Sequence, residues 1–308
     1  MLNSIAIDAV AVISHSVQLG GPTITPQSGD PVPSIAEADA TGEIAELYAD
    51  IRQSLGMPFV NLVWRNLASV PGGLKWAWNT MKPLYQQGAV YVEARQLRDS
   101  QMLPTVPRLP REVLRAVGVD ASAEMSIQAA IDGYDRGNPL NIVTFSALMS
   151  RLRGEQPTAS PPAPVDAGPE PPVAGETPKM LNFDQMDPVV ADMVRAVNLL
   201  GARGRGREVQ VSLPRNLAHW PGFLSLYWTV LAPLHEDGRL ATCIDAVLED
   251  GLKRGGRMAA ALGDTPEPPE ETRRGVLESL ENLVPNAMGR MIPVVSLLKQ
   301  MMPTGEAA

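Results

Sequence analysis

The chain has 308 residues, of which 44% are apolar and 19% charged, and its formal net charge is −8. This length is enough for about two domains, and the composition is ordinary for a soluble globular protein. The acidic balance argues against nucleic acid as a partner, because affinity for phosphate backbones depends on an excess of Lys and Arg. The single cysteine, Cys243, excludes an intramolecular disulfide. A reducing cytoplasm is therefore the simplest compartment.

The beginning of the chain carries no recognisable targeting signal. The stretch IAIDAVAVISHSVQLGG at 5–21 lacks a basic n-region and contains Asp8, so we do not expect a signal peptide. No run reaches the roughly 20 apolar residues that a membrane span needs, and we expect no membrane association. Residues 1–33 are predicted to be a flexible N-terminal segment.

The next segments have the apolar spacing of amphipathic helices. Residues 35–55 place apolar side chains at i, i+3 and i+4, and Gly56 followed by Pro58 is predicted to end that helix. Similar patterns predict helices over 111–118, 122–137, 240–262, 270–284 and 288–302. Strand-like alternation is scarce. The predicted fold class is all-α.

A duplicated motif organises the chain. Residues 64–90 and 214–240 align without a gap at an offset of 150, with eleven identities that include Trp78/Trp228. Such an internal repeat indicates that the fold contains two related structural units. In both copies Pro-Gly stands at a predicted helix start, and the internal Pro83 and Pro233 are predicted to kink or end their helices.

The duplication predicts two pseudo-twofold-related helical repeats, over 34–153 and 180–303. Between them, residues 154–179 are rich in Pro, Ala and Gly, a composition typical of an extended linker. The cleft between the repeats is the expected place for a small-molecule site.

Few residues carry chemistry by motif alone. The Gly/Arg-rich stretch 201–208 is read as a solvated connection in preference to an anion-binding loop. His219 is assigned a structural role at a helix entry, and Cys243 a place in the core. Asn138, between Gly137 and Pro139, is predicted to cap the next helix, with the orientation of a water as the alternative. No metal-ligand spacing or nucleophile elbow occurs, so we expect no metal and no cofactor.

Three motifs together resemble the group I (DehI-type) 2-haloacid dehalogenases. They are YADIRQSLGMPFVNLVWRNLASVPGGLKWAW at 48–78, YDRGNP at 134–139 and VSLPRNLAHWPGF at 211–223. The resemblance covers most of residues 40–250. It implies two helical repeats joined by a long linker, usually as a homodimer, with the active site between the repeats. The implied reaction is hydrolytic removal of halide from a 2-halocarboxylate by water attack, with inversion.

The resemblance also implies roles for individual residues. Asn138 matches the water-orienting Asn, Ser212 precedes the position of the catalytic base, and Phe59 and Leu62 match aromatic pocket positions. Where the family has its catalytic Asp, this sequence has Leu213. Glu208 lies five residues earlier and is the candidate replacement base, although i and i+5 diverge by about 140° on a helix.

Two further functions remain open. The first is a relative that does not dehalogenate and binds or transforms another small carboxylate in the cleft. The second is a helical interaction protein whose cleft is vestigial. Asn138, Ser212 and Phe59 favour a surviving pocket, and Leu213 favours the loss of dehalogenation.

Overall fold

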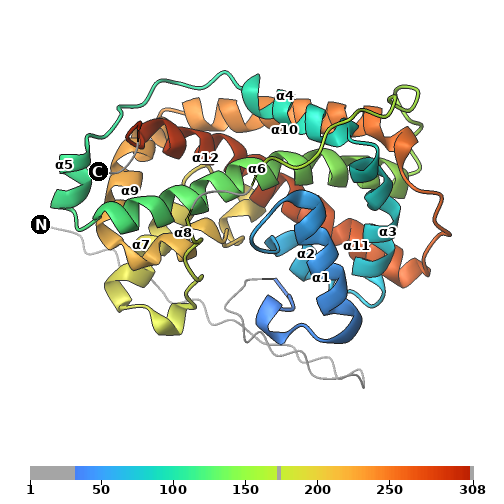
Figure 1. Cartoon of the computed structure of the whole chain (residues 1–308), viewed down its shortest axis with the longest axis horizontal. Helices are drawn as coiled ribbons and strands as arrows, with labels where there is room; N and C mark the ends of the chain where they lie inside the picture. Colours follow the sequence, from blue (N-terminus) through green and yellow to red (C-terminus); the bar gives the residue numbers. More distant parts are fainter. Residues whose placement is uncertain (1–31, 172–174, 306–308) are drawn as a thin grey trace, which may run out of the picture.

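A computed structural model describes residues 32–171 and 175–305, which contain helices and no strand (Figure 1). The all-α prediction is therefore confirmed for this part of the chain. The longer helices are α1 (Gly42–Leu55), α3 (Gly73–Gln86), α4 (Ala89–Asp99), α6 (Ala121–Leu152), α7 (Pro188–Asn198), α9 (Pro221–Glu236), α10 (Arg239–Met258), α11 (Glu270–Leu283) and α12 (Arg290–Met301). The shorter elements are α2 (Leu62–Leu67), α5 (Arg111–Ala116), α8 (Leu213–Asn216), 3₁₀ turns at Glu37–Asp39, Phe183–Gln185, Gly204–Arg207, Leu217–His219 and Ala259–Ala261, and a π-helical turn at Val284–Gly289.

The predicted flexible segment 1–33 lies outside the described residues except for its last two positions. Within the described ranges, no helix combines the length and apolar character that a bilayer crossing requires.

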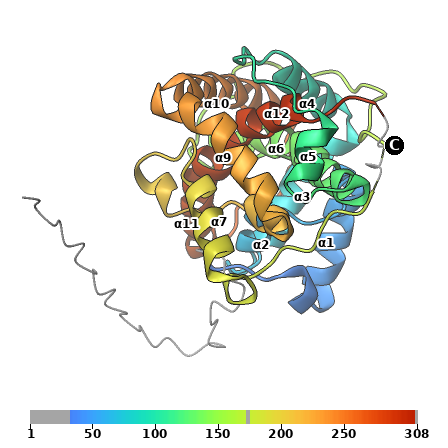
Figure 2. The ribbon, with the colours of Figure 1, turned by 90° about the vertical axis from the view of Figure 1, so that its left-hand side faces the viewer.

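Helix α6 runs through the middle of the molecule. In Figure 1 it crosses the centre, and in Figure 2 it lies among α10, α12, α9 and α4. Twenty-four of its 32 residues are buried, which is more than one helix face can hold, so neighbours must cover it on several sides.

The length of α6 corrects two sequence predictions. The helix was expected to end at Gly137, but it continues through Pro139 to Leu152. A proline inside a helix costs about 3 kcal/mol. The buried side chains beyond it, such as Val143 and Phe145, each contribute about 1.5–3 kcal/mol and together exceed that cost. The predicted capping role of Asn138 is also wrong, because this residue lies in the helix interior.

The helix predicted over 35–55 begins only at Gly42, after a 3₁₀ turn at Glu37–Asp39. The other helix boundaries follow the sequence more closely. Gly56 ends α1 in the left-handed conformation, with φ 65°, as the motif predicted. Pro221 is the first residue of α9, and Gly72 caps α3. The internal Pro83 and Pro233 do not end their helices, which continue to Gln86 and Glu236.

Two hydrophobic clusters form the core, and each draws on both halves of the chain. The first combines α1 to α4 with the C-terminal half of α6 and with α11. The second combines α7 to α9 and α12 with α5 and the N-terminal half of α6. The proline-rich stretch between the halves is held on the surface, where the Val165 amide donates to the Gln87 carbonyl at 2.8 Å.

Helices α6 and α10 pack closely because glycines stand at their contact. A Cβ on Gly255 would overlap the Ser146 side chain and the Ala147 backbone, and a Cβ on Gly251 would lie 2.8 Å from Ile142 Cδ1. The absence of side chains at these two positions lets the backbones approach.

We predict that Gly255→Ala lowers the free energy of unfolding by about 1–3 kcal/mol, because the added methyl group forces α6 and α10 apart at a buried contact. Urea denaturation measures the effect. Gly168→Ala is the matched control, since a Cβ there meets no atom within 4 Å, and it should change stability by less than about 0.5 kcal/mol. Equal effects of the two substitutions would contradict the packing argument.

Candidate functional site

One face of α6 carries three polar residues toward the short helices α2 and α8. Tyr134, Asn138 and Asn141 are spaced i, i+4 and i+7, so they share a face. The Tyr134 hydroxyl donates to Asn216 Oδ1 of α8 at 2.9 Å. Trp64 Nε1 of α2 donates to Asn141 Oδ1 at 3.0 Å. This face therefore joins both copies of the duplicated motif.

A small cavity opens beside this face. It is lined by Asn61, Leu62, Val63, Tyr134, Asn138, Val211, Ser212, Leu213, Ala287, Met288 and Met291. Its volume is about 30 Å³, above the roughly 10–15 Å³ that one water needs. We call it the inner cavity.

A larger, more open cavity of about 270 Å³ adjoins the inner cavity, because Tyr134 and Ser212 line both. We call it the outer cavity. Other residues that line it are Glu37, Phe59, Arg65, Lys179 and Asn216. The Phe59 and Tyr134 ring centroids are 4.8 Å apart, so Phe59 packs beside a residue that lines both cavities.

The structure brings most of the candidate residues together. Asn138, Leu62, Ser212 and Leu213 line the inner cavity, and Phe59 lines the outer one. These side chains come from distant parts of the chain, and the fold alone makes them neighbours.

Glu208 is placed elsewhere. It is exposed in the connection before α8 and is not among the residues that line either cavity. Its suggested role as a replacement base therefore has no geometric support.

Among the described residues, no carboxylate lines the inner cavity. Glu37 lines the outer cavity, but its Oε1 accepts from the Val60 amide at 2.6 Å and its Oε2 is paired with Arg52. Leu213, which the sequence resemblance aligns with the catalytic Asp, is 0% exposed. The chemistry of the inner cavity is that of amides, hydroxyls and apolar side chains.

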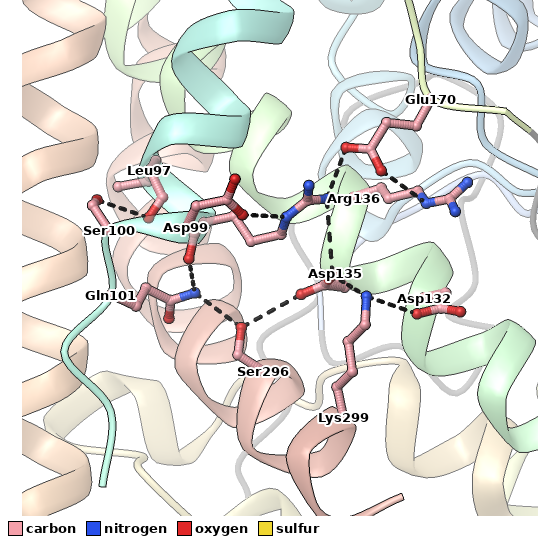
Figure 3. Close-up of polar contacts among 11 residues, drawn as sticks. Leu97, Asp99, Ser100, Gln101, Asp132, Asp135, Arg136, Glu170, Ser296 and Lys299 are labelled. Atoms are coloured by element: carbon pink, nitrogen blue, oxygen red, sulfur yellow. Dashed lines mark hydrogen bonds and ion pairs between the residues drawn. The ribbon is translucent and has the colours of Figure 1, made fainter. Parts of the chain in front are cut away.

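The buried carboxylate closest to Asn138 along α6 is committed to a separate polar network (Figure 3). Asp135 Oδ2 lies 2.8 Å from Lys299 Nζ of α12 and 3.8 Å from Arg98 Nη1 of α4. Glu170 of the proline-rich stretch lies 2.8 Å from Arg98 and 3.4 Å from Arg136. This network ties α4, α6, α12 and the stretch together, and Asp135 lines neither cavity.

Two amide side chains that line the inner cavity each have one atom with no hydrogen-bond partner within the described part of the protein. Asn138 Nδ2 and Asn61 Oδ1 are both buried and unpaired, and their residues are 5% and 7% exposed. Buried polar groups are nearly always satisfied, so this pair marks where a water or ligand fits. Sequence reasoning missed Asn61, which stands in an apolar run with no motif to single it out.

The connection before Ser212 is held by a buried guanidinium. Arg290 of α12 donates to the carbonyls of Asn198 and Gly206 through Nη1, at 3.0 and 3.2 Å, and to Val209 through Nη2 at 3.0 Å. Burial lowers the pKa of Arg290 to about 10. Since the connection turns carbonyl oxygens inward onto a cation, the anion-binding alternative for 201–208 has no support at these positions.

Ser212 is fixed between the halves of the chain. Arg65 of α2 donates to Ser212 Oγ at 3.4 Å, and Val211 donates its amide to Asn198 Oδ1 at 2.8 Å. His219 lies apart, exposed, with its Nε2 2.7 Å from the Lys179 carbonyl, which fits its structural assignment.

Sequence comparison finds similar proteins of one kind. The chain is 35% identical over 106 residues to an (R)-2-haloacid dehalogenase of Pseudomonas putida, which is 32% of this chain and 35% of that protein. It is 29% identical over 123 residues to a configuration-inverting 2-haloacid dehalogenase of Alcaligenes xylosoxydans xylosoxydans, which is 39% of this chain and 41% of the relative. This chain is a relative of the 2-haloacid dehalogenases.

The aligned part is limited: it spans 35–41% of the length of these curated dehalogenases. No family model matches the chain. Solved dehalogenase structures extend the similarity of fold. A D-2-haloacid dehalogenase mutant in complex with D-2-CPA superposes with a TM-score of 0.67 at 17% identity, over 88% of this chain and 96% of that one. A second D-2-haloacid dehalogenase mutant gives 0.70 at 16% identity, over 93% and 99%.

We predict that Arg290→Lys lowers the free energy of unfolding by about 1.5–3 kcal/mol, because an ammonium cannot reproduce the forked contact with three carbonyls. Urea denaturation is again the measurement. Arg203→Lys in the same connection is the control: Arg203 pairs with Asp245 on the surface, and such pairs contribute less than about 1 kcal/mol. A larger loss for Arg203→Lys would refute the role of Arg290.

Proposed function

We propose that this chain is a 2-haloacid dehalogenase-like protein that takes a small 2-halocarboxylate in the two adjoining cavities. One observation carries the proposal: Asn138, Ser212 and the base position 213 line a single cavity, in a chain related to 2-haloacid dehalogenases. In this proposal the larger outer cavity admits the carboxylate, and the inner cavity holds the water.

The proposed site lies between two pseudo-twofold repeats, 34–153 and 180–303, joined by the linker 154–179. Matching contacts of the duplicated Arg-Asn pair support this arrangement. Asn66 Nδ2 donates to the Pro33 carbonyl at 2.8 Å, and Asn216 Nδ2 donates to the Pro178 carbonyl at 2.7 Å.

The residue before each of these asparagines repeats a second contact. The Arg65 carbonyl accepts from the Ile35 amide at 3.0 Å, and the Arg215 carbonyl accepts from the Leu181 amide at 3.2 Å. The same pair thus fastens one incoming segment in each half, beside the outer cavity.

The proposed chemistry is water attack at the α-carbon in line with the departing halide. Asn138 orients the water, and Ser212 helps to hold the substrate carboxylate, with Phe59 and Leu62 on the apolar part of the substrate. Positioning of this kind supplies much of the rate in such a reaction. A carboxylate must take the proton of the water, which contributes typically 10²–10⁴-fold.

This chain has Leu213 where the 2-haloacid dehalogenases have that carboxylate. The difference favours a second candidate function. Since no carboxylate among the described residues lines the inner cavity, the chain is well suited to bind, or transform by another route, a small carboxylate that it does not dehalogenate. The homodimer and the cytoplasmic location remain predictions.

We predict that Leu213→Asp raises halide release from 2-chloropropionate by on the order of 10²–10⁴ over the wild type, because it restores a general base beside Asn138. Each enantiomer is assayed separately with a halide electrode. Leu213→Asn is the control, since it adds a polar group of the same shape that cannot accept the proton.

Three outcomes are informative. An active Leu213→Asp with an inactive Leu213→Asn supports the proposed site. Comparable activity in the wild type would mean that another residue supplies the base. If none of the three proteins releases halide and none binds either enantiomer, the proposal is ruled out.

A further inference from the structure

Asn61 occupies the N-cap position of a helix, but its side chain does not cap that helix. It is the N-cap residue of α2, with extended backbone at φ −61° and ψ 155°, yet its side chain makes no capping hydrogen bond. An N-cap asparagine usually accepts from a backbone amide of the first turn. The side chain has therefore given up a stabilising local interaction.

The Asn61 side chain faces the central helix instead. A Cβ built on Gly137 would lie 3.5 Å from Asn61 Oδ1 and 2.7 Å from Met57 Cε. The Met57 distance is a steric overlap, whereas 3.5 Å is an ordinary van der Waals contact. The oxygen of Asn61 therefore lies close to the turn of α6 that carries Asn138.

The two amides present complementary unpaired atoms to one cavity. Asn61 Oδ1 is an acceptor and Asn138 Nδ2 is a donor, and neither has a partner among the described residues. A water can donate to the first and accept from the second, which are two of the two to four hydrogen bonds that a buried water makes. Leaving both atoms unpaired would cost stability.

We propose that Asn61 is a second water-binding residue, which together with Asn138 fixes one water in the inner cavity. The identity of this water as the nucleophile rests on the proposed function; its position does not. An amide oxygen holds a water by accepting one of its hydrogens, but it is far too weak a base to remove the proton.

The role assigned to Asn61 is thus separable from that of the base. In the hydrolysis, the water oxygen forms a bond to the α-carbon as the carbon–halogen bond breaks, and halide leaves with the electron pair. The proton of the water passes to the carboxylate that Leu213→Asp introduces. Asn61 acts on the direction of the attacking lone pair, so its removal lowers kcat more than it changes KM.

The first test is a crystal structure of the wild type at a resolution that shows ordered waters. We expect one water within about 3.2 Å of both Asn61 Oδ1 and Asn138 Nδ2. An Asn61 side chain bonded to a protein group, or the absence of a shared water, would overturn the inference whatever the activity of the protein.

The second test uses the Leu213→Asp enzyme and (R)- and (S)-2-chloropropionate. Adding Asn61→Leu, which keeps the size and removes the acceptor, should lower kcat about tenfold and leave KM within about twofold. Asn61→Ser keeps an acceptor oxygen that is too weak a base to take the proton, and it should recover part of kcat relative to Asn61→Leu. Asn79→Leu, at an exposed position of α3, is the matched control.

An unchanged kcat in Asn61→Leu would overturn the inference while leaving the proposed function intact. If Leu213→Asp releases no halide and neither enantiomer binds, the proposed function fails. Without halide release, the position of the water in the crystal structure alone decides the role of Asn61.

Discussion

The burial of α6 is the constraint on which the rest of the structure depends. A helix with 24 of 32 residues buried must be covered on several sides, and the chain supplies the cover from both halves. Helix α10 approaches through Gly251 and Gly255, and α4 and α12 close other sides. The same helix contributes to both hydrophobic clusters, so the two halves cannot separate without exposing it.

This arrangement explains how a site arises at the centre. One face of α6 contains Tyr134, Asn138 and Asn141, and it receives α2 from one half and α8 from the other. The duplicated Arg-Asn-Leu-Ala motif builds these two flanking elements, and its role is architectural. Arg290 holds the connection before α8 in place, because its guanidinium donates hydrogen bonds to three backbone carbonyls. The candidate site residues stand on these same elements: Asn138 in α6, Leu62 in α2 and Leu213 in α8.

The sequence predicted the parts of the fold that depend on local signals. Apolar periodicity and Gly56 located α1, and the repeat located the two segments that meet at α6. The sequence prediction failed at Pro139. Local propensity favours the end of the helix there, and only the burial of the following side chains outweighs it. The sequence accordingly predicted a cap at Asn138, although this residue lies inside the helix with its Nδ2 unpaired.

Only the site residues that belong to a recognisable sequence motif could be predicted. Asn138, Ser212, Leu213 and Leu62 were named from a resemblance, and the structure places them in one cavity. Asn61, Met288 and Met291 carry no sequence signal, since their part in the cavity depends on packing between segments far apart in the chain. Glu208 was chosen by proximity in sequence, which does not guarantee proximity in space, and it lies on the surface.

The central claim is that the cavity still recognises a small 2-halocarboxylate although it lacks a general base. Titration calorimetry of the wild type with each enantiomer of 2-chloropropionate tests it most directly, with Ser212→Ala measured in parallel and its folding checked by thermal denaturation. The account predicts saturable one-site binding of at least one enantiomer, weakened about tenfold in Ser212→Ala by the loss of one hydrogen bond to the substrate carboxylate. No binding to the folded wild type, or equal affinity in the folded variant, would contradict it.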